Sequence, residues 1–180
     1  MVNQDLAKIF YKIALYLQMD EVAFKPQAYE RAAQGLEILA ENIEVIYKKE
    51  GRAGLERIPG VGRGLAEKII EYLETGHINE HEKLKKKIPV DLDELSAIEG
   101  LGPKGIKKLY QKLGIKNREE LEAAARGHTI RNLEGFGEKS EEKILKGIEF
   151  LKKSGGRFTL GFTMPFIREI ESRLKKLKEV

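Results

Sequence analysis

The pentapeptide Ile58-Pro-Gly-Val-Gly62 recurs twice along the chain, as Ile98-Glu-Gly-Leu-Gly102 and Leu133-Glu-Gly-Phe-Gly137. Each copy reads apolar, any residue, glycine, apolar, glycine, and an amphipathic pattern follows it, over 65–73, 106–113 and 144–151. A lysine stands eight residues after the first glycine in every copy, as Lys68, Lys108 and Lys143. Three matches to so tight a template indicate a repeated unit of two helices joined by a short loop.

The sequence around these repeats also has helical periodicity. Leu6, Ile9, Phe10, Ile13, Ala14 and Leu17 follow the spacing of one buried helix face. We expect a second helix from near Pro26 to about Tyr47, and a last one over 166–177. Alternation of strand type is nearly absent, so the sequence predicts an all-α fold. Boundaries are expected at the lysine run 85–87 before Pro89 and at Ser154-Gly-Gly156.

The bulk composition excludes several classes of protein. Charged residues make up 34% of the 180 residues and hydrophobic ones 41%, which favours a soluble globular protein. No apolar stretch approaches twenty residues, so we expect no membrane partner and a cytoplasmic location. The chain has no cysteine, which excludes disulfides and thiolate metal sites. Its formal net charge of +4 identifies no partner alone.

The repeated loops have the features of a phosphate-binding site. Paired glycines let a chain turn sharply and approach a ligand closely, and the first amides of the next helix then converge on an anion. We expect Val61, Leu101 and Phe136 to turn inward and join the two helices. Such loops read no base, so they predict DNA-backbone binding without sequence preference. The alternative is that they are only helix–helix turns with glycine caps.

Charge ranks the second loop above the third as a DNA contact. From Gly100 to Lys116 there are five lysines and no acid, whereas from Gly135 to Leu151 four glutamates face three lysines. Glu138 stands where a phosphate would come. We therefore expect the third loop to serve mainly in packing.

These motifs resemble the amino-terminal half of a family X DNA polymerase, of the bacterial or archaeal type related to DNA polymerase beta. The most specific segments are Phe24-Lys-Pro-Gln-Ala-Tyr-Glu-Arg-Ala-Ala33, Ile58 to Ile69 and Glu74-Thr-Gly76. The resemblance implies a lyase-like domain with the first hairpin over 1–85, tandem helix-hairpin-helix fingers over 90–153, and a linker helix over 157–180 leading toward a palm that this sequence lacks. It also implies a role in DNA repair on gapped, nicked or 5′-phosphate DNA.

By this resemblance Lys68 corresponds to a lyase nucleophile, whose neutral amine attacks the sugar aldehyde of a 5′-deoxyribose phosphate. Lys25 and Tyr29 correspond to residues that hold the 5′-phosphate, with Arg31 adding positive charge. The alternative is that lysine merely suits this helix position, since Lys108 and Lys143 share it. The expected DNA- and phosphate-binding residues are Lys25, Tyr29, Arg31, Gly60, Gly62, Arg63, Gly64, Gly100, Gly102, Lys104, Gly105, Lys108, Gly135 and Gly137.

Family members also bind a monovalent cation, sodium or potassium, through hairpin carbonyls. The matching carbonyls are those of Ile58 and Val61 at the first hairpin, and of Ser96, Ile98 and Leu101 at the second.

Nucleotidyl transfer is not expected from this chain. It requires an aspartate triad that holds two metal ions, and the four aspartates (Asp5, Asp20, Asp91 and Asp93) all precede position 94. We interpret Asp91-Leu-Asp93 as a helix start, and His77 and His81 as surface histidines, so no divalent metal site is expected. The chain reads as an amino-terminal fragment, or else as a free-standing adaptor. Three functions remain: DNA binding alone, DNA binding with lyase activity, and a helix-hairpin-helix interaction adaptor without enzymatic activity.

Overall fold

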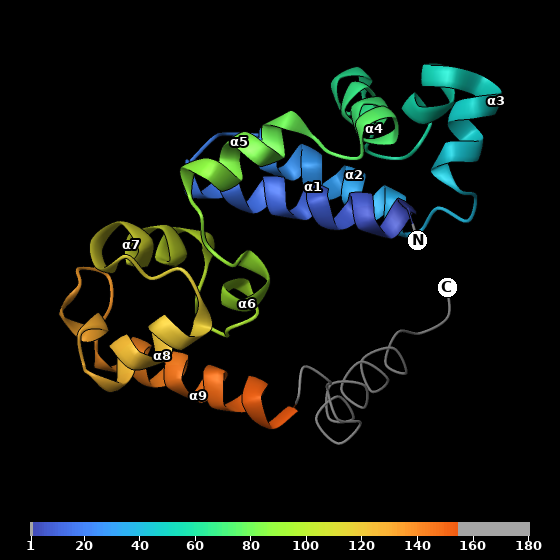
Figure 1. Cartoon of the computed structure of the whole chain (residues 1–180). Coiled ribbons are helices and arrows are strands. Elements are labelled where there is room, and N and C mark those ends of the chain that lie inside the picture. Colours follow the sequence, from blue (N-terminus) through green and yellow to red (C-terminus); the bar gives the residue numbers. More distant parts are fainter. Residues whose placement is uncertain (1, 155–180) are drawn as a thin grey trace, which may run out of the picture. The chain divides into compact units, whose positions relative to one another are not determined.

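The computed structural model describes residues 2–154, which form helices joined by loops (Figure 1). The elements are α1 (Val2–Met19), α2 (Lys25–Glu37), α3 (Ile43–Glu56), α4 (Arg63–Thr75), α5 (Asn79–Lys87), α6 (Leu92–Ser96), α7 (Pro103–Leu113), α8 (Arg118–Arg126), the 3-10 turn η1 (Ile130–Asn132) and α9 (Glu138–Ser154). No strand occurs in this part of the chain, so the all-α prediction is confirmed. The helix expected over 166–177 lies outside the described residues.

The chain divides into two compact units. Among the described residues, one unit holds 2–97 and 101–121, and the other holds 98–100 and 122–154. The domain boundaries expected from the sequence, 1–85 and 90–153, remain predictions. Within residues 2–154, no helix has the length and apolar character needed to cross a membrane.

The core of the first unit is built around α1. Leu6, Phe10 and Ile13 are fully buried, as the periodicity predicts. The ring of Phe10 meets that of Tyr29 from α2 edge to face, with centroids 5.2 Å apart, an arrangement that aromatic pairs favour. The α1–α2 pair is thereby fixed as the base on which the first hairpin sits.

The helix expected from Pro26 to about Tyr47 is two helices, α2 and α3, so that prediction was wrong. Asn42 ends the intervening loop: it is the N-cap of α3, and its side chain accepts a hydrogen bond from the Glu44 amide at 2.8 Å. On α1, the side chain of Asn3 makes further contacts. Its Nδ2 donates to the Glu41 carbonyl at 2.9 Å, and its Oδ1 accepts from the Ile43 backbone amide at 2.9 Å. These polar contacts satisfy backbone groups that a continuous helix would have paired internally.

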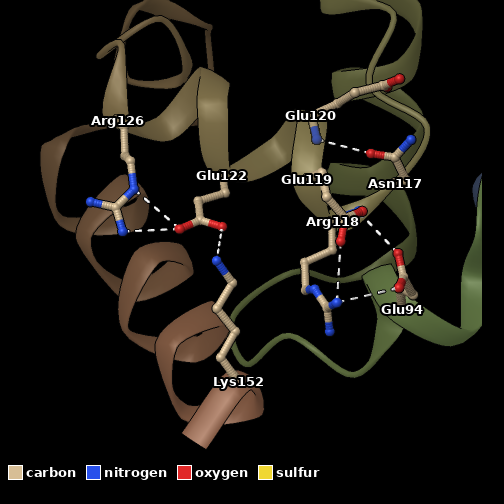
Figure 2. A network of polar contacts seen from close by, with 8 residues as sticks. All are labelled: Glu94, Asn117, Arg118, Glu119, Glu120, Glu122, Arg126 and Lys152. Atoms are coloured by element: carbon tan, nitrogen blue, oxygen red, sulfur yellow. Dashed lines mark hydrogen bonds and ion pairs between the residues drawn. The ribbon is translucent and has the colours of Figure 1, made fainter.

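Residues of α8 form hydrogen bonds and ion pairs with neighbouring elements (Figure 2). In the first unit, Glu94 accepts a hydrogen bond from the Arg118 amide at 3.2 Å and lies 3.6 Å from its guanidinium. In the second unit, Glu122 accepts from the Arg126 guanidinium at 2.9 Å and from the Lys152 ammonium of α9. Ile144 and Ile148 of α9 are buried in that unit, so α9 combines an apolar inner face with a charged anchor.

Candidate nucleic-acid interface

The three pentapeptides adopt closely similar backbones. Their first glycines have φ values of 83° (Gly60), 84° (Gly100) and 83° (Gly135), a left-handed conformation that favours glycine. The second glycines, Gly62 and Gly102, are extended and cap α4 and α7. Gly137, the third copy's second glycine, accepts from the amides of Ser140 and Glu141 at 3.0 Å each. The sequence repeat is therefore also a structural repeat.

Glycines of the first hairpin serve two different purposes. A Cβ at Gly60 would lie 2.6 Å from the carbonyl carbon of Arg31, so this glycine allows the loop to press against α2. On α2 itself, a Cβ at Gly35 would lie 2.1 Å from the Pro59 carbonyl oxygen. Gly62 and Gly64, in contrast, have nothing within 4 Å of an added Cβ. The loop is thus packed tightly against α2 at Gly60, and it is open at Gly62 and Gly64, where a ligand would approach.

The middle apolar residues differ in burial. Val61 and Leu101 are 4% and 5% exposed, so they turn inward as expected. Phe136 is only half-buried, and the inward prediction is therefore met in part at the third loop.

An open cleft of about 490 Å³ lies over the first hairpin. It brings together seven of the residues expected to bind phosphate or react with the sugar: Lys25, Tyr29, Gly60, Gly62, Arg63, Gly64 and Lys68. Arg31 does not line it; this exposed residue of α2 instead faces Gly60 through its backbone. The amides that open α4 have no earlier helical carbonyl to bond, so they add partial positive charge to the cleft.

Lys68 is held by an acid that the sequence did not single out. Its ammonium lies 3.0 Å from Glu71, and the lysine side chain is 29% exposed. Glu71 also accepts from the Asn79 backbone amide at 2.9 Å and from the Asn79 side chain at 2.6 Å. Burial alone would raise the pKa of Glu71, but these bonds from Asn79 and Lys68 outweigh it and lower that pKa. Glu71 is therefore an anion held in a fixed position, and it positions the Lys68 amine.

Tyr29 is also engaged. This residue is 4% exposed, and its hydroxyl donates a hydrogen bond to Glu80 at 2.8 Å. Burial raises the pKa of Tyr29 most, and the hydrogen bond to the Glu80 carboxylate raises it further. Glu80 is the second residue of α5 and lines the cleft. Sequence reasoning missed it, because nothing in the local pattern at Glu80 signals a partner 51 residues earlier.

Lysines of the second hairpin contact acidic residues that lie outside the segment from Gly100 to Lys116. Lys104 lies 2.6 Å from Glu21, and Lys107 donates to the Met19 carbonyl at 2.8 Å and to Asp20 at 3.1 Å. Hydrogen bonds from Lys87 and then Lys107 lower the pKa of Asp20 against the effect of burial. The inference that this hairpin lacks opposing acids was therefore wrong, because α1 and its following loop supply them.

Exposure separates the remaining residues of the second hairpin. Lys104 is 76% exposed and Lys107 is 26% exposed, while Gly105 and Lys108 are half-buried in α7. Gly102 again has open space where a side chain would stand. Among the expected contacts of this loop, Gly100, Gly102 and Lys104 are thus the exposed ones.

Carboxylates occupy the third hairpin. Glu141 is fully buried and accepts from the Arg131 amide at 3.0 Å, the Arg131 Nε at 2.7 Å and the His128 Nδ1 at 2.9 Å. Glu138, the first residue of α9, lies 3.3 Å from Arg131. Burial would raise the pKa of Glu141, but bonds from His128 and Arg131 lower it overall. The packing role expected for this loop agrees with that geometry.

The predicted absence of a divalent metal site stays a prediction, although the acids and histidines can be placed. Asp91 is the N-cap of α6 and accepts from the Glu94 amide at 3.0 Å, which is the helix start expected. His77 is exposed, but the His81 side chain is only 14% exposed, and burial lowers its pKa. The surface prediction was therefore wrong for His81. No cluster of three or more potential ligands from His, Cys, Asp and Glu occurs within residues 2–154.

The expected cation carbonyls lie in the hairpin segments. At the first hairpin, the Ile58 carbonyl accepts from the Val61 amide at 2.9 Å, which leaves it one further lone pair. Ser96 ends α6, and Ile98 and Leu101 follow in the segment before α7. Carbonyl oxygens suit a hard cation, and this assignment remains a prediction.

Two family models match the chain. A helix-hairpin-helix domain matches residues 1–78, and a SAM-like helix-hairpin-helix tandem matches residues 92–149. Together they include all three repeated loops.

Individual relatives are similar over different lengths. The DNA polymerase/3′-5′ exonuclease PolX of Bacillus subtilis is 33% identical over 100% of this chain and 31% of its own length. DNA polymerase lambda of Rattus norvegicus is 38% identical over 38% of this chain and 12% of its length. A DNA ligase of Natranaerobius thermophilus is 46% identical over 32% of this chain and 8% of its length.

The chain therefore spans about a third of the polymerase that it matches from end to end. The expected resemblance is confirmed by that match, by the partial match to the second polymerase and by the two helix-hairpin-helix models. The chain is therefore similar over its full length to part of a family X DNA polymerase, and it contains the helix-hairpin-helix regions that the two models describe.

Proposed function

We propose that this chain is a DNA-binding module of a family X repair polymerase and holds the sugar-phosphate backbone without reading sequence. The observation that carries the proposal is the cleft over the first hairpin, where Lys25, Arg63 and Lys68 surround a loop open at Gly62 and Gly64. Free amides at a helix start and nearby cations together bind phosphate. Groove-reading side chains are not required for such binding.

Salt dependence tests the proposal. If about three to five phosphates are neutralised, the logarithm of the association constant falls with log salt at a slope of roughly −3 to −4.5. Fluorescence anisotropy with labelled duplexes of scrambled sequence measures both the slope and sequence preference. We expect similar affinities for all sequences. An affinity independent of salt, or a strong preference for one sequence, would contradict backbone binding.

The relatives named as polymerases support a finer assignment to gapped, nicked or 5′-phosphate DNA. A terminal phosphate carries more charge than an internal one, and the cleft is lined by the cations Lys25, Arg63 and Lys68. Competition between intact, nicked and one-nucleotide-gapped duplexes tests this preference. If the chain binds no DNA at any salt concentration, the interaction-adaptor function is favoured instead.

A lyase reaction at Lys68 is the second candidate function, because Lys68 lies in the same cleft as Lys25 and Tyr29. A neutral amine would attack the C1′ aldehyde of a deoxyribose phosphate and lose water to form an imine. Removal of a C2′ proton would then expel the 3′-phosphate strand. Because the Lys68 ammonium is paired with Glu71 at 3.0 Å, this pair must open before attack.

Borohydride trapping tests this reaction on an incised abasic duplex. We expect Lys68→Ala to abolish the trapped adduct while leaving the fold and most DNA affinity intact. Lys108→Ala, at the matching position of the second hairpin, is the control and should trap normally. If the parent traps nothing, the chain is a binding module only.

For the hairpins, a monovalent cation is the proposed cofactor. The carbonyls of Ile58 and Val61 would hold it at the first loop, and those of Ser96, Ile98 and Leu101 at the second. Such an ion would add positive charge beside the phosphate. At constant ionic strength, replacing potassium by tetramethylammonium should weaken DNA binding; equal affinities would refute a bound cation.

A further inference from the structure

The charges that line the first cleft are not equally balanced. Arg63 Nε lies 3.4 Å from Glu67, and Lys68 lies 3.0 Å from Glu71. Each of these cations is therefore paired with an acid, and Glu67 also lies 4.0 Å from Arg52. Glu80 differs from the other two acids, because among the described residues it forms no ion pair.

The contact that Glu80 does make is with Tyr29, whose hydroxyl donates to its Oε2 at 2.8 Å. A carboxylate oxygen on that hydroxyl occupies the place that a phosphate oxygen would take, because both are anionic acceptors. The hydroxyl has one proton to donate. Tyr29 therefore donates either to Glu80 or to a ligand in the cleft.

We infer that Glu80 is a built-in competitor for the 5′-phosphate: it holds the Tyr29 hydroxyl, and its charge opposes an anion entering beside Lys25. This inference rests on the proposed function, and it specifies how that cleft is regulated. Phosphate binding requires Glu80 to leave Tyr29, and breaking that hydrogen bond costs free energy. The cleft therefore binds a terminal phosphate only if its attraction to Lys25 and the loop amides exceeds that cost.

Glu80→Gln tests the inference, because it removes the charge and keeps the size of the side chain. Two unit charges 4 Å apart interact by roughly 1 kcal/mol in bulk water and by more at a protein surface. We therefore expect the variant to bind a gapped duplex with a 5′-phosphate about five- to tenfold more tightly. Affinity for the same duplex with a 5′-hydroxyl should stay close to that of the parent.

Two control variants separate this effect from general ones. Glu74→Gln removes the same charge and breaks the same kind of contact, since Tyr47 donates to Glu74 at 3.2 Å, but it lies outside the cleft. Glu82→Gln removes the other acid from the first turn of α5, which controls for the helix dipole. Neither should change the ratio of the 5′-hydroxyl to the 5′-phosphate dissociation constant. Thermal melts by circular dichroism check that each variant is folded.

Combining Tyr29→Phe with Glu80→Gln tests the role of the hydroxyl. If Tyr29 passes its hydrogen bond to the phosphate, the double variant should lose part of the gain. Equal tightening for both duplex ends, or an unchanged ratio, would overturn the inference while leaving backbone binding in place. Failure of the parent and of Glu80→Gln to bind either duplex would overturn the proposed function and the inference with it.

Discussion

Glu141→Gln should destabilise the second unit without touching the proposed DNA cleft. The wild-type carboxylate is fully buried, and both its oxygens are used: one accepts from His128 and the Arg131 Nε, the other from the Arg131 amide. Glutamine offers one oxygen and one donor group. In either orientation, the amide nitrogen faces a donor that the carboxylate had satisfied.

The size of the loss follows from the exposure of the partners. A hydrogen bond to a charged group contributes about 1.5–3 kcal/mol, and leaving a buried donor unsatisfied costs a similar amount. The His128 side chain is 61% exposed, so its contact with Glu141 contributes almost nothing to the free energy of unfolding, because water can replace it. Arg131 is 30% exposed and rehydrates in part. We therefore expect a loss of about 2–3 kcal/mol in the free energy of unfolding.

Two optical probes make the assay specific to one unit. All six tyrosines precede residue 111 and belong to the first unit, so tyrosine fluorescence during urea denaturation reports that unit alone. Far-ultraviolet circular dichroism reports the helices of both units. The variant should shift the circular dichroism transition to lower urea and leave the fluorescence transition nearly unchanged. Glu142→Gln, an exposed neighbour on α9, is the matched control.

Acid titration adds an independent check. The pKa of Glu141 is lowered in the folded protein, so its contribution is complete above the ordinary glutamate value and is lost as pH falls through the folded value. The parent should lose stability below about pH 4.5 more steeply than Glu141→Gln. Unfolding free energies within about 0.5 kcal/mol of each other at pH 7, or an equal loss in Glu142→Gln, would refute the reasoning.

Three further variants test the hairpins and their supports. Gly60→Ala should cost about 3 kcal/mol or more in urea denaturation, because φ is 83° and the new Cβ would meet Arg31; Gly62→Ala should keep the fold and weaken DNA binding in anisotropy. Asn42→Ala should cost about 1 kcal/mol by thermal melting, through loss of the α3 cap. Lys104→Ala should reduce the salt slope by about 1, whereas Lys107→Ala should chiefly lower stability, since its ammonium is bonded to the Met19 carbonyl and Asp20. Equal behaviour of the two lysine variants would contradict this division.

Local patterns predicted the backbone well. The three loops, the helices that follow them and α1 depend on spacings that a few neighbouring residues determine. The break between α2 and α3 was missed because apolar positions continue across it. Its signal was present, since Asn42 is a favoured N-cap and Glu44 stands in the first turn of α3. The helices α5 and α8 were also missed; each is only nine residues long and rich in charged residues.

The contents of the candidate site could not be predicted in the same way, and the reason is physical. The three loops have nearly the same φ at their first glycine, so the free amides alone do not rank them as anion sites. What distinguishes the loops is the carboxylate beside each one. Glu141 lies within the third repeat and could be suspected from local charge, whereas Glu80 and Glu21 reach the first and second hairpins from other helices and loops.

Tertiary packing therefore decides which loop is available to a phosphate. At the third hairpin the acid is fully buried and bonded to Arg131, so removing it costs stability and does not open a site. At the second, Lys104 and its partner Glu21 are 76% and 66% exposed, and such surface pairs are weak enough for DNA to replace. The first hairpin lies between these cases, because Glu80 is held by one neutral hydroxyl that a phosphate can also use. Neutralising Glu80 should consequently change ligand preference, whereas neutralising Glu141 should change stability.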